Sequence, residues 1–437
     1  MAMGTRRLGT NGRTVATGNV VAALDIGTHK ICCLIATHEP VYASAGQPSQ
    51  RLRALGLGLQ RSQGIEGGAV VDLALAQTAV AAAIAQAEHA AGLRIDTVHV
   101  GVTSGHPQSS TFNGHVEVAG SVVEASDIAR LDAGARAFAG RTGRALLVLN
   151  RIAYGLDGTH AVRDPHGLAS RRLFANHHAV TVEAGPLRNI GLLVESCHLG
   201  LDDMLPTAYA SALAATTQDE RQIGVAVVDI GAGAISIAGF ADGHFVHCES
   251  LPTGGQHITR DVAHGLGIPL AEAERIKTLY GSMVQSVTDE HELVPLGEVQ
   301  ADGFTASAAT RADLTRIVAR RVEDVLAAVR SRLEACSVER IRHAGVVLTG
   351  GTSQVMGLDG VAAMLLARPA RVSAPRSTNG LTGRFAGSVQ GPAFSCVVGL
   401  AMAAAQPSPW LHGYDAGHAP LRPGYLGRVE RWLRESF

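Results

Sequence analysis

Two copies of one short motif constrain the fold of this chain more than any other feature of its sequence. Val21–Ile35 reads VAALDIGTHKICCLI and Val225–Phe240 reads VAVVDIGAGAISIAGF. Each copy is an apolar run rich in β-branched residues, then Asp-Ile-Gly, then a turn of small residues and a second apolar run. This pattern predicts a β-hairpin whose turn carries a carboxylate. Two copies lying far apart in the chain predict two related half-molecules.

A third segment, Ala344–Leu358, reads AGVVLTGGTSQVMGL. It predicts a buried strand that runs into Thr-Gly-Gly, with a helix starting near Ser353. Glycine has no Cβ, so the backbone at Gly350 and Gly351 can pass close to the α-phosphate or the sugar of a nucleotide.

The two hairpin turns have the chemistry of phosphate binding. Their glycines let backbone N–H groups approach an anion, and Thr28 and Lys30 add a hydroxyl donor and a positive charge. Asp25 and Asp229 would repel phosphate, so they fit such a site only with Mg²⁺ and ordered water between them and the phosphates. One such motif alone is more often a simple Asx turn. The duplicated hairpins together with Thr-Gly-Gly predict a clamp for the β- and γ-phosphates.

In order and character these motifs resemble the actin, Hsp70 and sugar-kinase superfamily, whose members share a duplicated ribonuclease-H-like fold that closes around ATP. Within it, LDIGTHKI, VVDIGAG, TGGQHITRDVAHGLGIPLAEAERIKTLYG and VVLTGGTSQVMGL resemble the FtsA family of cell division proteins, from Val20 to Ala405. The resemblance implies an α/β, actin-like ATPase fold with a small α+β insert domain and a C-terminal amphipathic helix.

The resemblance also implies a set of nucleotide-binding residues, with Mg²⁺ held through water at the two aspartates. By this resemblance Glu274 and Lys277 would contact the adenosine; taken alone, the two residues favour an ordinary charged pair on an exposed helix face. The set is Asp25, Gly27, Thr28, Lys30, Asp229, Gly231, Gly233, Glu274, Lys277, Gly350 and Gly351.

The second turn departs from the family pattern. FtsA relatives usually carry Gly-Gly-Gly-Thr there, whereas this chain has Gly231, Ala232, Gly233 and Ala234. Ala232 puts a methyl group where the backbone should approach phosphate, and Ala234 has no hydroxyl to donate. We therefore expect ATP to bind but to be hydrolysed slowly.

Composition and resemblance together divide the chain into segments. The Asp-Pro-His-Gly-Leu turn at 164–168 resembles an Asn-Pro-x-Gly-Leu turn of the FtsA insert, which contacts the next subunit in polymers. Residues 245–310 correspond to the subdomain on which the FtsZ tail docks. The segments are a flexible tail (1–18), the first half (19–96 and 185–222), the insert (97–184), the second half (223–360), a return to the first half (361–405), a linker (406–423) and a terminal helix (424–437).

The terminal helix has an amphipathic pattern. One arc of the helical wheel is apolar, and on the opposite arc arginines outnumber glutamates. After a linker rich in proline, this arrangement is typical of a helix lying in the plane of an anionic membrane, although it could also dock on the protein's own surface. The residues predicted to bind the membrane are Tyr425, Leu426, Arg428, Val429, Arg431, Trp432, Leu433, Arg434 and Phe437.

Bulk composition excludes other classes. The chain has 37 Lys and Arg against 38 Asp and Glu, so it carries no electrostatic footprint for nucleic acid. Its six cysteines form no Cys-x-x-Cys pair, and most lie in apolar runs. They indicate small core residues in a reducing compartment, neither a zinc site nor a redox motif.

The resemblance implies a bacterial cell division protein at the cytoplasmic side of the inner membrane, at the septum. It would bind Mg-ATP, polymerise through its insert, anchor the FtsZ ring by the FtsZ C-terminal tail and recruit later division proteins. Three alternatives remain open at this point. A sugar or carboxylate kinase of the same superfamily would need a general base. An Hsp70-like chaperone would need a peptide-binding domain after Ala405. A pilus-assembly relative of FtsA is the third.

Overall fold

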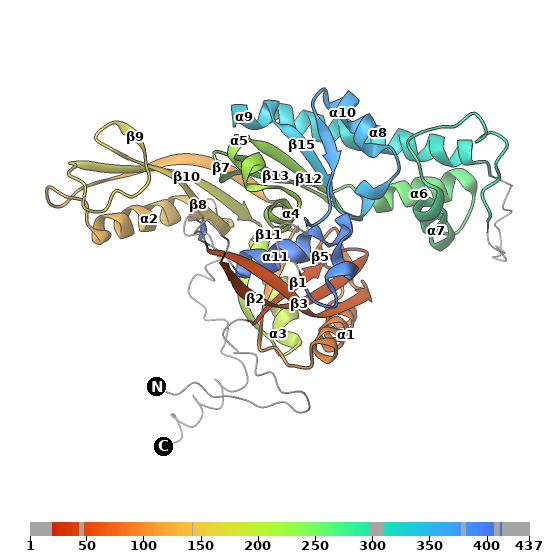
Figure 1. Cartoon of the computed structure of the whole chain (residues 1–437), viewed down its shortest axis with the longest axis horizontal. Helices are drawn as coiled ribbons and strands as arrows, with labels where there is room; N and C mark the ends of the chain where they lie inside the picture. Colours follow the sequence, from red (N-terminus) through yellow and green to blue (C-terminus); the bar gives the residue numbers. More distant parts are fainter. Residues whose placement is uncertain are drawn as a thin grey trace, which may run out of the picture.

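The computed structural model describes residues 20–42, 48–141, 143–296, 309–376, 382–405 and 411–412. The predicted N-terminal tail and the predicted membrane helix lie outside these residues. Figure 1 shows two sheet-containing halves stacked on one another, with an insert projecting to one side and the helices α6 and α7 to the other. Within the described part of the chain, no helix is both long and apolar enough to cross a membrane.

The first half is built on a sheet with the strand order β11-β6-β1-β2-β3. Its β1–β2 hairpin is the first predicted hairpin, with Asp25 opposite Cys32. Every residue of 31–36 is buried, which explains why the sequence shows a continuous apolar run instead of alternation. The strands are β1 (Val20–Ile26), β2 (Lys30–Tyr42), β3 (Pro48–Arg61), β6 (Thr97–Val102) and β11 (Gly200–Pro206).

The second half repeats this arrangement, with the order β14-β13-β12-β15-β16. In both sheets a hairpin carries a third antiparallel strand on one side and two parallel strands on the other. The shared topology is that of a duplicated fold. The strands are β12 (Val225–Ile230), β13 (Ile235–Ala241), β14 (His244–Leu251), β15 (Gly345–Thr349) and β16 (Ala370–Val372).

Helices cover both sheets. In the first half, α1 and α3 pack together below the sheet in Figure 1, while α4 and α11 pack together between the two sheets. In the second half, α8 begins at a capping box formed by Thr310 and Asp313 and runs across the sheet. The helices are α1 (Leu73–Ala91), α3 (Ala184–Ser196), α4 (Thr207–Ala215), α5 (Gln218–Ile223), α6 (Gly255–Leu266), α7 (Leu270–Tyr280), α8 (Arg311–Ala335), α9 (Glu339–His343), α10 (Leu358–Leu366) and α11 (Ser395–Ala405).

The insert is an antiparallel sheet with one helix. Its strands are β7 (Gln108–Glu117), β8 (Ala145–Leu156), β9 (Thr159–Val162) and β10 (Arg172–Val182), and its helix is α2 (Ala125–Gly140). The predicted boundary at residue 97 is too early, because β6 hydrogen-bonds with β1 and β11 in the first sheet. Its buried run reads like any other strand, so sequence alone could not assign it to a sheet.

Two further boundaries differ from the prediction. The predicted return to the first half at residue 361 is too early, because β16 still pairs with β15 in the second sheet. The predicted linker contains a short strand, β17 (Leu411–His412), which pairs with β8. After Thr-Gly-Gly the chain forms a 3-10 turn, η2 (Gly351–Gln354), and α10 begins only after Gly357, which has a positive φ of 79°.

The cysteines lie where the apolar runs predicted. Five of the six are buried, Cys197 is half-buried, and all are free thiols.

Candidate nucleotide-binding site

A cavity of about 560 Å³ lies between the two halves, in the size range of a small-ligand site. The turns of the β1–β2 and β12–β13 hairpins line it, together with η2 and the facing ends of α6 and α7. Every residue predicted to bind nucleotide lies in its wall: Asp25, Gly27, Thr28, Lys30, Asp229, Gly231, Gly233, Glu274, Lys277, Gly350 and Gly351.

The two hairpin turns are equivalent and touch one another. The N–H of Gly27 donates to the Lys30 carbonyl at 3.0 Å, and the N–H of Gly231 donates to the Ala234 carbonyl at the same distance. A Cβ at Gly233 would lie 2.4 Å from the Thr28 hydroxyl oxygen, so a larger residue there would have to displace the Thr28 side chain. The predicted face-to-face arrangement of the turns is therefore present.

Two features of the backbone at Gly350 require a glycine there. Its φ of 88° belongs to the left-handed region, and a Cβ there would lie 2.2 Å from the Asp229 carboxylate. The Thr-Gly-Gly segment thus passes directly over the second aspartate.

The two aspartates form the electrostatic centre of the cavity. Burial is the main cause that raises the pKa of both, and the pKa of Asp229 reaches about 6 when all its neighbours are included. The negative charge of Asp25 raises the pKa of Asp229 further, while a hydrogen bond from Ser211 and the charge of Lys30 oppose the shift. A divalent cation near the pair would favour the ionised form of both carboxylates.

These residues fit a Mg²⁺ ion that is held mainly by phosphate and water. Carboxylate oxygens suit Mg²⁺, which keeps several of its waters in protein sites. Among the described residues, no group of three or more His, Cys, Asp or Glu side chains could hold a metal ion by itself. The pair of aspartates can therefore orient a hydrated cation but cannot enclose it.

Lys30 lies at the floor of the cavity. Its ammonium group donates to the Ala393 carbonyl and lies 3.8 Å from the centre of the Phe394 ring. These contacts come from η5 (Pro392–Phe394), the turn that precedes α11. The positive charge is thereby held near both aspartates.

Sequence reasoning missed a row of hydroxyl groups that joins the halves beneath the cavity. Ser211 of α4 donates to the Asp229 carboxylate at 2.5 Å, and Thr207 of α4 lies 3.1 Å from the Ser236 hydroxyl. Thr349 and Ser395 form a third such pair at 2.7 Å. The only signal in the sequence was that α4 spaces two hydroxyls one turn apart in an otherwise Ala-rich helix.

Glu274 and Lys277 form an ion pair of 2.6 Å on α7. Lys277 also donates to the Thr259 hydroxyl at 2.9 Å and to the Gly255 carbonyl at 3.3 Å, both on α6. The Lys277 side chain is only 11% exposed. The pair therefore lies in the cavity wall between two helices and is not an exposed surface pair.

Comparisons with known proteins agree on one family. A family model described as "Cell division protein FtsA" matches residues 226–399, and one described as "SHS2 domain inserted in FTSA" matches residues 104–181. The cell division protein FtsA of Agrobacterium fabrum is 35% identical over 96% of this chain and 95% of its own. The chain belongs to the FtsA family of cell division proteins. The FtsA of Pseudomonas aeruginosa is 31% identical, over 97% of this chain and 100% of its own.

Solved structures show the fold of this FtsA-family chain to be actin-like. The PilM–PilN type IV pilus biogenesis complex matches with a TM-score of 0.61 at 15% identity, over 89% of this chain and 99% of the other. MreB5 of Spiroplasma citri bound to ADP matches with a TM-score of 0.51 at 12% identity, over 88% and 95%. The kinase and chaperone alternatives are set aside by the FtsA match, and the pilus protein shares only the fold.

The second turn carries alanines at 232 and 234. The carbonyl of Ala232 accepts the N–H of Gln256 at 2.8 Å, and that of Gly231 accepts the N–H of Gly255 at 2.9 Å. The start of α6 thus holds the turn in place despite the alanines. Ala234 still supplies no hydroxyl to the cavity.

Proposed function

We propose that this FtsA-family chain binds Mg-ATP between its hairpins, polymerises and holds the FtsZ ring at the cytoplasmic side of the inner membrane. The observation that carries the proposal is the meeting of the two Asp-Ile-Gly turns with Thr-Gly-Gly in one cavity. Phosphates would lie against the glycine turns, Mg²⁺ and its water between Asp25 and Asp229, and the adenosine beside Glu274 and Lys277.

The partners follow from family membership. The FtsZ tail would dock on the subdomain of 245–310, of which residues 297–308 lie outside the described part. Large apolar side chains are exposed there, including Leu279, Val287 and Leu293, and could receive a peptide. The helix of 424–437 would attach the polymer to anionic lipid at the septum, where later division proteins are recruited.

Deleting the insert is expected to abolish filaments on anionic lipid while leaving ATP binding intact. The structure shows where the deletion should begin and end. The Glu183 N–H donates to the Gly105 carbonyl at 2.8 Å, so the two ends of the insert lie side by side. Residues 106–182 can be replaced by a short Gly-Ser link, whereas a deletion from residue 97 would remove β6 from the first sheet. Electron microscopy on lipid monolayers is the measurement.

ATP binding serves as the control for folding of the deletion variant, because none of the described residues between 106 and 182 lines the cavity. Normal filaments formed by a variant that binds ATP would show that the subunit contact lies elsewhere.

Hydrolysis of ATP is expected to be slow or undetectable. Ala234 cannot donate to the γ-phosphate or position water, and Ala232 adds a methyl group to the phosphate-binding turn. Release of phosphate at about 1 s⁻¹ or faster, the range of a good kinase, would contradict this expectation. The assay is phosphate release at saturating Mg-ATP, with and without anionic vesicles.

A further inference from the structure

The chain passes between the two sheets at two neighbouring places. The first passage leaves α4 and reaches β12 through α5. The second leaves β16 and leads to α11, which packs against α4. The cavity opens between the halves that these passages connect, so any change in its width must be accommodated where they lie.

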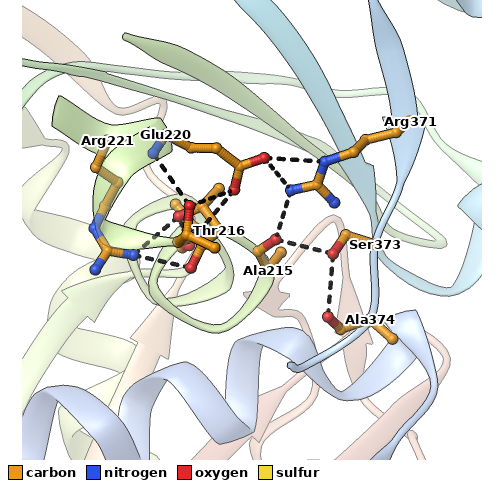
Figure 2. A network of polar contacts seen from close by, with 9 residues as sticks. Ala215, Thr216, Glu220, Arg221, Arg371, Ser373 and Ala374 are labelled. Carbon is orange, nitrogen blue, oxygen red and sulfur yellow. Dashed lines mark hydrogen bonds and ion pairs between the residues drawn. The ribbon is translucent and has the colours of Figure 1, made fainter. Parts of the chain in front are cut away.

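One carboxylate joins the two passages (Figure 2). Glu220 of α5 accepts from the Arg371 guanidinium at 2.6 and 3.1 Å through one oxygen. Through its other oxygen it accepts the Thr217 N–H at 2.8 Å and so completes the capping box of α5. The same side chain therefore fixes the outgoing passage and ties it to the returning one.

The returning passage also caps α4. The Ala215 carbonyl accepts from Arg371 at 3.2 Å and from the Ser373 hydroxyl at 2.9 Å, as Figure 2 shows. The Ala214 carbonyl accepts the Arg376 N–H at 3.1 Å. Carbonyls at a helix C-terminus lack partners within the helix, and a cation there is favourable for the helix dipole. The end of α4 is thus held by Arg371 of β16 and by Ser373 and Arg376, which follow β16 in the second passage.

Helix α4 connects this network to the cavity. Ser211 lies one helical turn before Ala215 and donates to Asp229, and Thr207 lies one turn earlier beside Ser236. A shift of the α4 terminus would move both hydroxyls relative to the second half. The network and the second aspartate are therefore linked through one rigid helix.

We infer that Glu220 and Arg371 are positioning residues that hold the two halves at the separation needed for the nucleotide. The pair contacts none of the residues predicted to bind the nucleotide. It affects them through the position of α4. When it is broken, the cavity samples wider openings and bound nucleotide leaves faster. The faster release of nucleotide rests on the proposed function, whereas the wider opening of the cavity concerns the protein without ligand.

The test is the Glu220→Gln variant, because the glutamine oxygen can still cap α5 while the charge pair with Arg371 is lost. The matched control is Asp261→Asn. Asp261 pairs with Arg321 inside the second half, and these side chains are 34% and 33% exposed, close to the 31% and 34% of Glu220 and Arg371. Both variants lose one ion pair of similar exposure, so a general loss of stability would affect them alike.

The width of the cavity is measured first, without nucleotide, by spin labels at Glu66 and Met356 in a Cys197→Ser background. Both residues are exposed, and each lies close in sequence to a residue of the cavity wall, Gly68 in the first half and Val355 in the second. Glu220→Gln should broaden and lengthen the distance distribution, and Asp261→Asn should leave it as in the parent. Dissociation of a fluorescent ATP analogue is measured second, and Glu220→Gln should accelerate it by about 3- to 10-fold. Arg371→Lys keeps the positive charge. Its distance distribution and its dissociation rate should therefore be closer to those of the parent than the values for Arg371→Ala.

An unchanged distance distribution in Glu220→Gln would overturn the inference, as would an equal change in Asp261→Asn. Failure of the parent protein to bind ATP would instead contradict the proposed function, and the distance measurement would still decide the role of the pair.

Discussion

Replacing Trp432 and Leu433 together with glutamate is expected to release the protein from membranes and to leave ATP binding unchanged. Leu433 lies near the middle of the predicted apolar arc, and Trp432, the largest apolar side chain of the helix, lies at its edge. Burying both contributes about 2–5 kcal/mol, and a carboxylate in the arc is costly to insert. The new charges are also repelled by anionic lipid. Together these terms should exceed the partition free energy of so short a helix.

The two functions should separate because residues 413–423, between β17 and the predicted helix, include two prolines and two glycines. We do not expect a segment of this composition to transmit a rigid packing change to the cavity. Neutralising Arg428, Arg431 and Arg434 should weaken binding less, by about 1 kcal/mol each, and mainly on anionic lipid. Flotation with vesicles at two salt concentrations measures both effects. Undiminished flotation of the double variant would mean that the helix docks on the protein and that another segment holds the membrane.

Replacing Asp229 with lysine is expected to reduce affinity for Mg-ATP by about 100-fold or more, since it exchanges a carboxylate for a fixed ammonium where Mg²⁺ and its water should lie. The change also removes the hydrogen bond from Ser211 and crowds Gly350, whose backbone passes over this side chain. Competition with a fluorescent nucleotide gives the affinity, and circular dichroism reports the fold.

Asp229→Asn is the matched control for shape, because it keeps the size of the side chain and loses only its charge. It should bind Mg-ATP with an intermediate affinity. Parental affinity in a folded Asp229→Lys protein would reject the assignment of this aspartate to the metal.

The duplicated hairpins made both the fold and the cavity predictable. An apolar run that ends in Asp-Ile-Gly predicts a strand followed by a tight turn. Because the motif recurs, it also predicts a second sheet with the same topology. Glu274 and Lys277 could be assigned only by resemblance, since their spacing on α7 alone favours an ordinary surface pair.

What could not be predicted depends on contacts between distant parts of the chain. Strand β6 has the pattern of any buried strand, and only its pairing with β1 excludes it from the insert. In the sequence, Ser211 is one more small residue in an Ala-rich helix. Only the packing of that helix against the second sheet shows that Ser211 donates to Asp229. Glu220 and Arg371 lie in unremarkable charged segments, and only the two passages between the halves bring them together.

If the facing turns bind ATP through Mg²⁺, the affinity must depend on the metal. Calorimetric titration of the full chain with ATP, in Mg²⁺ and again in excess EDTA, measures this dependence. We predict one nucleotide per chain in Mg²⁺ and an affinity at least about tenfold weaker in EDTA, since two repelling carboxylates then face the phosphates. Equal affinity in both buffers, or no binding in Mg²⁺, would contradict the account.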